Sequence, residues 1–287
     1  MPLQKLTLKP GVNRENTRYT NENGWYESDK IRFRQGTPEK IGGWERISPN
    51  TYLGICRSLW NWITLAGKNL MGVGTTSKFY IENGGAYYDI TPIRAEHTLT
   101  NPFATDTTTN SGGNTTVTVT DATGGFISGA YVTFYGGTAV GGVTVSGEYL
   151  INFLTASTYT ITVTGTASSS TTGGGTVYAV YQLNPGAVNY TPSSGWGAGT
   201  WGTGGVSAEG IRLWSQFNFG ENLIFAYRGG SMYYWVAQDG VNTHAVALED
   251  LVGASNVPTT VNFVLGSDVS RFVFAFGANN LGSGTFN

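Results

Sequence analysis

Hydrophobic and polar residues alternate with a period of two in many short segments of the chain. The clearest are Thr115–Thr120 and Tyr159–Thr164, in which Val, Ile or Tyr take one face and Thr takes the other. This is the period of a β-strand, because neighbouring side chains of a strand point to opposite sides. The composition agrees, since the chain is rich in Gly, Thr, Val, Tyr and Asn rather than in strong helix formers. The sequence therefore predicts an all-β fold.

Between residues 56 and 96, four short strands alternate with tight turns. Asn83-Gly84-Gly85 is a hairpin signal, because Asn and Gly tolerate the positive φ that a two-residue turn requires. Four consecutive antiparallel strands of this length are typical of one β-propeller blade or one meander. The four strands are predicted at Cys56–Trp62, Leu70–Gly74, Lys78–Glu82 and Ala86–Ile90.

A second set of similar strands follows about 150 residues later. Its members are predicted at Ile211–Gln216, Asn222–Tyr227, Ser231–Val236 and His244–Leu248, and a third set begins at Val261–Leu265 and Arg271–Gly277. The repeat rests on three matches: Leu59-Trp60 with Leu213-Trp214, Asn69-Leu70 with Asn222-Leu223, and Phe79-Tyr80-Ile81 with Tyr233-Tyr234-Trp235.

Repeats of this length predict propeller-like blades. A propeller closes with about four to eight blades, so the blades are incomplete in this chain. The sequence is therefore expected to be truncated, or to obtain its missing blades from elsewhere.

The segment between the two sets, residues 97–192, holds only three charged residues and is dense in Thr, Ser and Gly. Its alternating runs predict an inserted immunoglobulin-like β-sandwich. Thr105–Gly113 and Ala167–Gly175 lack the alternation and are expected to be disordered linkers. Further strands of the insert are predicted at Tyr131–Tyr135, Tyr149–Leu154 and Val177–Gln182.

Residues 1–55 are polar and rich in Asn and Arg, which predicts an extended N-terminal arm. In Lys30–Arg34, Ile31 and Phe33 share one face and the cations share the other. The organisation expected is an arm at 1–55, a first blade at 56–96, the insert at 97–192, a Gly/Trp connector at 193–210, and a second blade with the start of a third at 211–287.

Charge is spread unevenly along the chain. Residues 1–100 hold 13 of the 16 Lys and Arg and carry a net charge of +4, whereas the remainder carries −6. Acidic residues are interleaved with the cations of the arm, which favours a protein interface of complementary charge. A phosphate-binding track and an ordinary solvated face stay open as alternatives. The candidate interface residues are Arg14, Arg18, Trp25, Lys30, Arg32, Arg34 and Trp44, and Trp196 and Trp201 are expected to anchor the connector.

Few residues are suited to catalysis or metal binding. His97 and His244 are the only histidines and are expected at a surface or a sheet edge, and the single Cys56 is expected to be a buried thiol. Two His and one Cys are too few for a typical zinc site, so no metal or cofactor is expected. Gly197, Gly199 and Gly202 match a dinucleotide-binding pattern, but no helix is predicted after them. We predict no enzyme.

No apolar run approaches the length of a membrane span, and Met1–Gly11 lacks the apolar core of a signal peptide. No membrane span is therefore expected. A carboxylate cluster formed by residues such as Glu82, Asp89, Asp239 and Asp268 would support a third possibility, a propeller glycosidase or depolymerase.

Several segments resemble one family. Lys9–Glu15, Gly24–Gly36 and Pro38–Trp44 look like the opening of a widespread group of tailed-bacteriophage virion proteins, and Gly195–Gly202, Leu213–Leu223 and Tyr233–Trp235 also resemble it. The resemblance covers the whole chain and is least specific in the insert. Phe217 and Tyr227-Arg228 depart from the pattern of the group.

The resemblance implies a nozzle or hub protein of the tail of a short-tailed phage. Such a protein bears a propeller and assembles as a ring, usually a homohexamer, below the portal and adaptor proteins. The implied location is the virion tail, after synthesis in the host cytoplasm. DNA would pass through the ring without specific binding, and the acidic part of the chain suits a channel wall because it repels DNA. The alternative is a receptor- or glycan-binding virion module, with the insert contacting the host.

Overall fold

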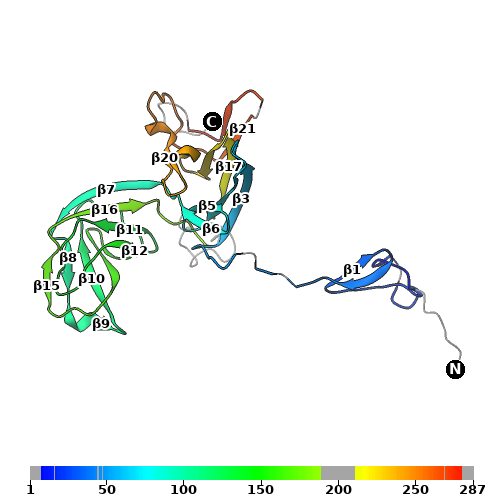
Figure 1. Ribbon diagram of the computed structural model, residues 1–287, viewed down its shortest axis with the longest axis horizontal. Helices are drawn as coiled ribbons and strands as arrows, with labels where there is room; N and C mark the ends of the chain where they lie inside the picture. Colours follow the sequence, from blue (N-terminus) through cyan, green and yellow to red (C-terminus); the bar gives the residue numbers. More distant parts are fainter. Residues whose placement is uncertain are drawn as a thin grey trace, which may run out of the picture. The chain divides into compact units, whose positions relative to one another are not determined.

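The computed structural model describes residues 8–15, 17–43, 45–46, 48–188, 211–267 and 269–279. Its contacts divide the chain into two units, Met1–Pro49 and Asn50–Asn287. No α-helix occurs among the described residues, and 48% of the structure is in strands. The strands form several antiparallel sheets, none of which is closed (Figure 1). The prediction of an all-β fold is therefore confirmed.

The first unit is built on a short hairpin of β1 (Ile31–Arg34) and β2 (Thr37–Lys40). Gln35 and Gly36 both have positive φ, which is the geometry of a two-residue turn between twisted strands. Phe33 packs edge-on against Trp25, with ring centroids 5.9 Å apart. Ile31 and Phe33 are half-buried, whereas Arg32 and Arg34 are exposed, which agrees with the predicted alternation.

The second unit contains a four-stranded sheet whose spatial order follows the sequence, β3-β4-β5-β6. These strands agree with the four that were predicted, to within one residue at each end. Their bounds are β3 (Cys56–Ile63), β4 (Asn69–Thr75), β5 (Phe79–Asn83) and β6 (Ala86–Asp89).

A second four-stranded sheet has the same sequential order, β17-β18-β19-β20, and a two-stranded sheet, β21-β22, follows it. Short 3-10 turns, η2 (Ala237–Asp239) and η3 (Leu248–Asp250), flank β20. The strands are β17 (Trp214–Phe219), β18 (Asn222–Tyr227), β19 (Met232–Trp235), β20 (Val246–Ala247), β21 (Phe263–Gly266) and β22 (Val273–Phe276).

These three sheets stack face to face, and their first strands β3, β17 and β21 lie side by side (Figure 1). Gln216 Nε2 donates to Ser58 Oγ (2.7 Å) and Trp60 Nε1 donates to Asn218 Oδ1 (3.2 Å), so β3 and β17 run in the same direction. The first interface buries stacked rings of Phe79 and Phe225, with centroids 3.9 Å apart. We call this arrangement the sheet stack.

The residue matches on which the predicted repeat rested are out of register. Leu70 pairs with Trp62, whereas Leu223 pairs with Asn218. If the two leucines were equivalent, Trp62 would correspond to Asn218, and Trp60 would then correspond to Gln216 rather than to Trp214. Moreover, Leu70 and Leu223 belong to one core cluster between the two sheets. Their side chains therefore point toward each other. Equivalent residues of two sheets stacked in the same direction would instead both point the same way along the stack.

The strand ladders give the correct correspondence. Trp60, Gly72 and Ile81 are paired across neighbouring strands of the first sheet and form one row. The corresponding row of the second sheet consists of Phe217, Ile224 and Tyr234. The side chains of both rows point along the stack in the same direction. The sequence matches were off by one to three residues. An odd shift moves every side chain of a strand to the other face, and apolar residues on both faces made the error invisible in the sequence.

The insert consists of two antiparallel sheets that enclose one core. The first has the order β13-β14-β10-β8-β15, with β9 beside β10, and the second has the order β12-β11-β16-β7. The bounds are β7 (Ile93–Thr100), β8 (Phe103–Thr105), β9 (Asn110–Ser111), β10 (Asn114–Thr120), β11 (Tyr131–Tyr135), β12 (Gly147–Leu150), β13 (Asn152–Thr155), β14 (Thr158–Thr164), β15 (Thr171–Gly173) and β16 (Thr176–Gln182).

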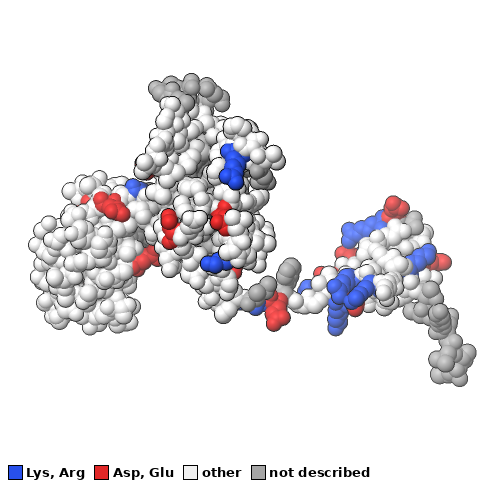
Figure 2. Space-filling view, turned by 45° about the horizontal axis from the view of Figure 1, so that its top comes forward, with Lys and Arg blue, Asp and Glu red and all other residues white. Residues whose placement is uncertain are grey.

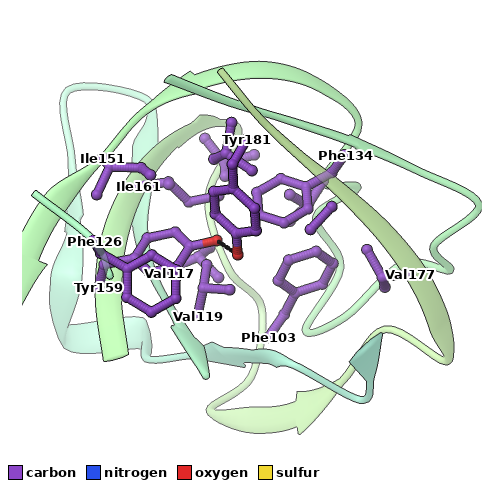
Figure 3. Packing of buried hydrophobic residues seen from close by; sticks show 14 of the residues in the cluster. Phe103, Val117, Val119, Phe126, Phe134, Ile151, Tyr159, Ile161, Val177 and Tyr181 are labelled. Carbon is purple, nitrogen blue, oxygen red and sulfur yellow. Dashed lines mark hydrogen bonds between the residues drawn. The ribbon is translucent and has the colours of Figure 1, made fainter. Parts of the chain in front are cut away.

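The core of the insert contains the inward residues of the alternating strands, together with Phe103, Phe126 and Phe134 (Figure 3). At its centre the hydroxyl groups of Tyr159 and Tyr181 are 2.8 Å apart and share a hydrogen bond. Val and Ile face this core and most of the Thr residues face outward, as the period of two predicted, but Thr115 lies on the core side and is fully buried.

Two predictions about the insert are wrong. Tyr149–Leu154 is not one strand, because the chain crosses from β12 to β13 in the other sheet at the buried Ile151. The two expected linkers are ordered: η1 (Thr107–Thr109) is capped by the Asp106 side chain, and β15 pairs with β8. The buried Thr105 hydroxyl explains why the expected linkers are ordered. It joins the two segments, because its Oγ1 donates to the main-chain oxygens of Ser169 and Thr171.

The predicted first boundary of the insert does not coincide with the end of a strand. β7 begins at Ile93 and pairs with β16 through most of its length, so the predicted boundary between 96 and 97 falls inside a strand. The predicted end at 192 lies outside the described residues.

Candidate assembly surfaces

The first unit carries a group of exposed cations. The guanidinium groups of Arg14 and Arg18 lie 3.5 and 3.4 Å from the carboxylate of Glu27. Both also lie over the ring of Tyr26, at 5.8 and 5.2 Å from its centroid. The two arginines thus share one acid and one ring, and a positive charge remains exposed.

The hairpin holds the other predicted cations. Arg32 and Arg34 point to the exposed face of β1, and Arg32 Nε lies 3.0 Å from Glu39 Oε2 on β2. Lys30 has a positive φ of 57° and lies exposed just before the strand. Figure 2 shows Lys and Arg gathered on this unit, beside interspersed acids, whereas the insert is almost free of charged atoms on the face shown. Pairing with neighbouring acids leaves a mixed-sign surface, which suits a charged protein partner.

The predicted aromatic anchors are only partly described. Trp25 is half-buried, packs on Phe33 and forms a β-bridge with Val12. Trp44, Trp196 and Trp201 lie outside the described residues.

The outer face of the β21-β22 sheet is apolar and exposed. Phe263 pairs with Phe276 and Leu265 pairs with Phe274, so all four side chains lie on one face. Each is about half exposed, and Phe272 beside them is 64% exposed. The opposite face of this sheet is covered, because Val264 and Ala275 pack against Phe217 and Ile224 of the stack. These residues were predicted to lie in strands, but their shared apolar face was not predicted.

The other end of the sheet stack also exposes apolar side chains. Leu59 and Ile63 of β3 point away from β17 and are 59% and 66% exposed. On the other face of the same strand, Trp62 is buried in the interface. The stack thus ends in an apolar face on each side; we call the β21-β22 face the leading face and the β3 face the trailing face. Exposed apolar patches of this kind mark contact surfaces.

A buried polar cluster joins the stack to the insert. The Lys78 side chain is only 2% exposed, and its Nζ lies 2.6 Å from Asp89 Oδ2 and contacts Glu148 Oε1 of β12. Gln182 Nε2 donates to both carboxylates, and Nζ lies 4.2 Å from the centroid of the Tyr131 ring. Burial opposes ionisation of Asp89, but the charge and hydrogen bonds of Lys78 and Thr91 outweigh it and lower its pKa. No pattern in the sequence predicts this cluster, since Lys78 contacts a carboxylate 70 residues further along the chain.

The histidines are more enclosed than expected. His97 Nδ1 lies 2.6 Å from Asp121 Oδ2 and 2.9 Å from Thr123 Oγ1. His244 Nδ1 lies 2.7 Å from the main-chain oxygen of Thr91, before rather than inside β20. Both are half-buried, as is Cys56, which was expected to be buried. Each histidine thus has a structural hydrogen-bond partner.

Asp121 is the most connected acid of the insert. Burial opposes its ionisation, yet hydrogen bonds from Thr123, His97 and Tyr181 lower its pKa. The Tyr181 hydroxyl lies 2.8 Å from Asp121 Oδ2, and burial raises the pKa of this tyrosine strongly. Asp121 therefore links the two sheets across their edge.

The acids that a glycosidase would require have other contacts. Glu82 accepts from the main-chain nitrogen of Gly85, Asp89 binds Lys78, and Asp239 lies in η2 of the second sheet. Asp268 lies outside the described residues. No group of three or more His, Cys, Asp or Glu close enough to hold a metal ion occurs in the described part of the chain. Within that part, no helix has the length and apolar character needed to cross a membrane.

Comparisons with known proteins add no relative. No family model matches the chain, and no curated protein matches it.

Proposed function

We propose that this chain is a structural, non-enzymatic subunit of the tail of a short-tailed bacteriophage. In this proposal it is a nozzle or hub protein, and its copies form a ring, of six members, around the DNA channel below the portal and adaptor. The single observation that carries the assembly is the open sheet stack with an apolar face at each end. The resemblance of residues 9–44 to phage tail proteins supplies the identity of the assembly.

The sheet stack supports a propeller-like arrangement. In a propeller, consecutive four-stranded sheets stack around an axis, and each sheet keeps its strands in sequential order. The sequential order of both four-stranded sheets and the parallel direction of β3 and β17 support this interpretation. We interpret β21-β22 as part of a third blade and the two sheets of the insert as an immunoglobulin-like sandwich.

The occupant we propose for the leading face is the trailing face of a second copy of this chain. That contact continues the stacking already present from β3 to β17 to β21. The two strands of the leading face contain no charged residue. A contact of one face with a different face generates a ring if it closes.

The N-terminal unit is proposed to contact a neighbouring subunit or the adaptor through Arg14, Arg18, Lys30, Arg32 and Arg34. These cations are exposed and accompanied by acids, which favours a protein partner over DNA. Residues 101–287 carry a net negative charge, which would keep DNA from adhering to a channel wall.

Light scattering of the purified full chain tests the assembly. We expect the wild type to be oligomeric and Phe274→Asp to be monomeric, because the charge would be buried without a partner in the contact. Phe153→Asp is the matched control, since Phe153 of β13 is equally exposed but lies on the insert. A wild type that stays monomeric would contradict the assembly, as would complete tails in virions lacking this protein.

A further inference from the structure

A hollow on the outer face of the sheet β12-β11-β16-β7 has the features of a ligand site. It has a volume of about 300 Å³ and is lined by Glu96, His97, Thr98, Tyr135, Tyr178, Ala179 and Val180. This volume lies at the lower end of the range of about 300–1,000 Å³ that is usual for small-molecule sites. It is therefore large enough for a ligand of one or two rings.

Two tyrosines form the aromatic wall of the hollow. Tyr135 of β11 and Tyr178 of β16 are a cross-strand pair, with ring centroids 5.1 Å apart and planes 18° from parallel. They are 48% and 43% exposed, although the residues on either side of Tyr178 are fully buried. The hydroxyl groups of both tyrosines make no protein hydrogen bond among the described residues, so they are available to a ligand.

The Tyr178 ring also lies close to the backbone of Gly136. Gly136 has a φ of +80°, and a Cβ there would lie 3.0 Å from Tyr178 Cδ2. The ring therefore lies against Gly136 as well as against Tyr135, and these contacts restrict its movement in the free protein. A preorganised ring loses little conformational freedom on binding, which favours affinity.

Polar groups flank the tyrosines on the same face. Thr98 pairs with Tyr178, and Glu96 pairs with Val180, so the Thr98 hydroxyl and the Glu96 carboxylate lie in adjacent rows of the sheet. Both residues are exposed. A carboxylate accepts hydrogen bonds only, so it selects a ligand that donates them.

The charge around the hollow excludes an anionic ligand. The insert contains no Lys or Arg after Arg94, and the Arg94 guanidinium lies over the core residue Tyr181, at 5.4 Å from its centroid. Nucleic acids and phosphorylated ligands require cations. A neutral ligand with an apolar face and many hydroxyl donors fits these residues, and a sugar ring has both properties.

We propose that the hollow between Tyr178 and Glu96 binds a neutral hexose or N-acetylhexosamine unit of a surface glycan. The apolar face of the sugar packs on the tyrosine pair, and its hydroxyl groups donate to Glu96 and bind Thr98. This site does not depend on the assembly proposed above, because all of its residues lie within one insert.

Titration of the full chain with neutral hexose and N-acetylhexosamine oligosaccharides, followed by calorimetry, tests the site. We expect saturable binding that Tyr178→Ala weakens at least tenfold, which corresponds to about 1.4 kcal/mol. Tyr178→Phe keeps the ring and should bind within about twofold of the wild type, whereas Glu96→Ala should weaken binding.

Phe153→Ala is the control, because it removes an equally exposed ring from the other sheet and should leave binding unchanged. Circular dichroism verifies that each variant is folded. The proposal is overturned if the wild type binds none of the oligosaccharides, or if folded Tyr178→Ala binds as the wild type does. Binding of a proline-rich peptide in their place, lost in Tyr178→Ala, would overturn the ligand class. Each of these readouts is independent of the oligomeric state.

Discussion

Lys78 lies buried at the contact between the sheet stack and the insert. Its ammonium group is shared between the carboxylates of Asp89 and Glu148, and its side chain is almost fully buried. We expect Lys78→Met to lower the free energy of unfolding by about 3 kcal/mol, at the low end for a broken buried ion pair. The low end applies because the two carboxylates keep 24% and 36% of their exposure.

Urea unfolding monitored by tryptophan fluorescence measures this loss. Lys68→Met is the matched control, since Lys68 is exposed in a turn and should change stability by less than about 0.5 kcal/mol. Adding Asp89→Asn and Glu148→Gln to Lys78→Met should restore part of the stability, because the uncompensated charges are then removed. Equal stability of Lys78→Met and wild type would contradict the role assigned to the cluster.

Asp121 predicts how the stability of the insert depends on pH. Its pKa is lowered in the folded state, so it stabilises the fold above its ordinary value of 3.8 and this contribution is lost as the pH falls further. Asp121→Asn should cost about 1.5–3 kcal/mol at neutral pH, because hydrogen bonds to a charged group are lost. Asp121→Asn should also make the stability of the insert fall less steeply as the pH decreases into the acid range.

Far-UV circular dichroism is the suitable measurement, because residues 97–192 contain no Trp. Some acid dependence should remain, since the pKa of Asp89 is also lowered. Asp250→Asn, at an exposed position, should leave the curve unchanged. A slope below pH 4 that is the same in Asp121→Asn and wild type would refute the assignment.

The sequence could predict single exposed positions but not these long-range partners. The alternation in Lys30–Arg34 correctly placed Ile31 and Phe33 on the covered face of β1. By contrast, Lys78 and Glu148 look like ordinary surface residues, because burial of a charge depends on where a strand 70 residues away is placed. The same reason hides the hollow, since Tyr135 and Tyr178 become neighbours only through the pairing of β11 with β16.

At the scale of elements, strand positions were predictable and strand register was not. Short apolar runs bounded by Gly and Asn define β3 to β6 to within a residue. To align the repeats in register, one must know which face of each strand packs against which neighbouring sheet. The sequence does not reveal this, because the stack buries apolar residues on both faces of β18. The sequence alignment consequently matched residues that face each other.

Gly74 tests the close approach of the first two sheets. A Cβ at this position would lie 2.6 Å from Trp214 Cδ1, and the Trp214 Nε1 is fixed by a 2.7 Å hydrogen bond to the Thr75 oxygen. We expect Gly74→Ala to destabilise the protein by about 1–3 kcal/mol through overpacking. Tryptophan fluorescence during urea unfolding measures it.

The control for this substitution is Gly42→Ala, which adds the same methyl group where no atom lies within 4 Å. It should change stability by less than about 0.5 kcal/mol. If Gly74→Ala were as stable as Gly42→Ala, the sheets would be able to separate without cost, and the tight stacking described for Phe79 and Phe225 would be wrong.

At the scale of the whole molecule, charge and apolar surface are divided among three parts. The cations gather on the N-terminal unit, the exposed apolar faces belong to the ends of the sheet stack, and the insert offers hydroxyl groups and tyrosines. The contacts proposed above follow this division: a charged protein partner for the N-terminal unit, a copy of the same chain for the sheet stack, and a neutral glycan for the insert.

The direction of the proposed contact between copies can be tested by mixing two variants. Phe274→Asp blocks the leading face and Ile63→Asp blocks the trailing face, so each variant alone should be monomeric. Each still has one intact face, and in an equimolar mixture these faces are complementary. Because the blocked faces prevent further addition, assembly in the mixture should stop at a heterodimer, whose mass light scattering measures.

If the leading face instead bound a second leading face, Ile63→Asp would dimerise alone, and mixing it with Phe274→Asp would form no new species. A wild type that forms larger species than the mixture, together with a heterodimer in the mixture, would establish the head-to-tail contact that a ring requires.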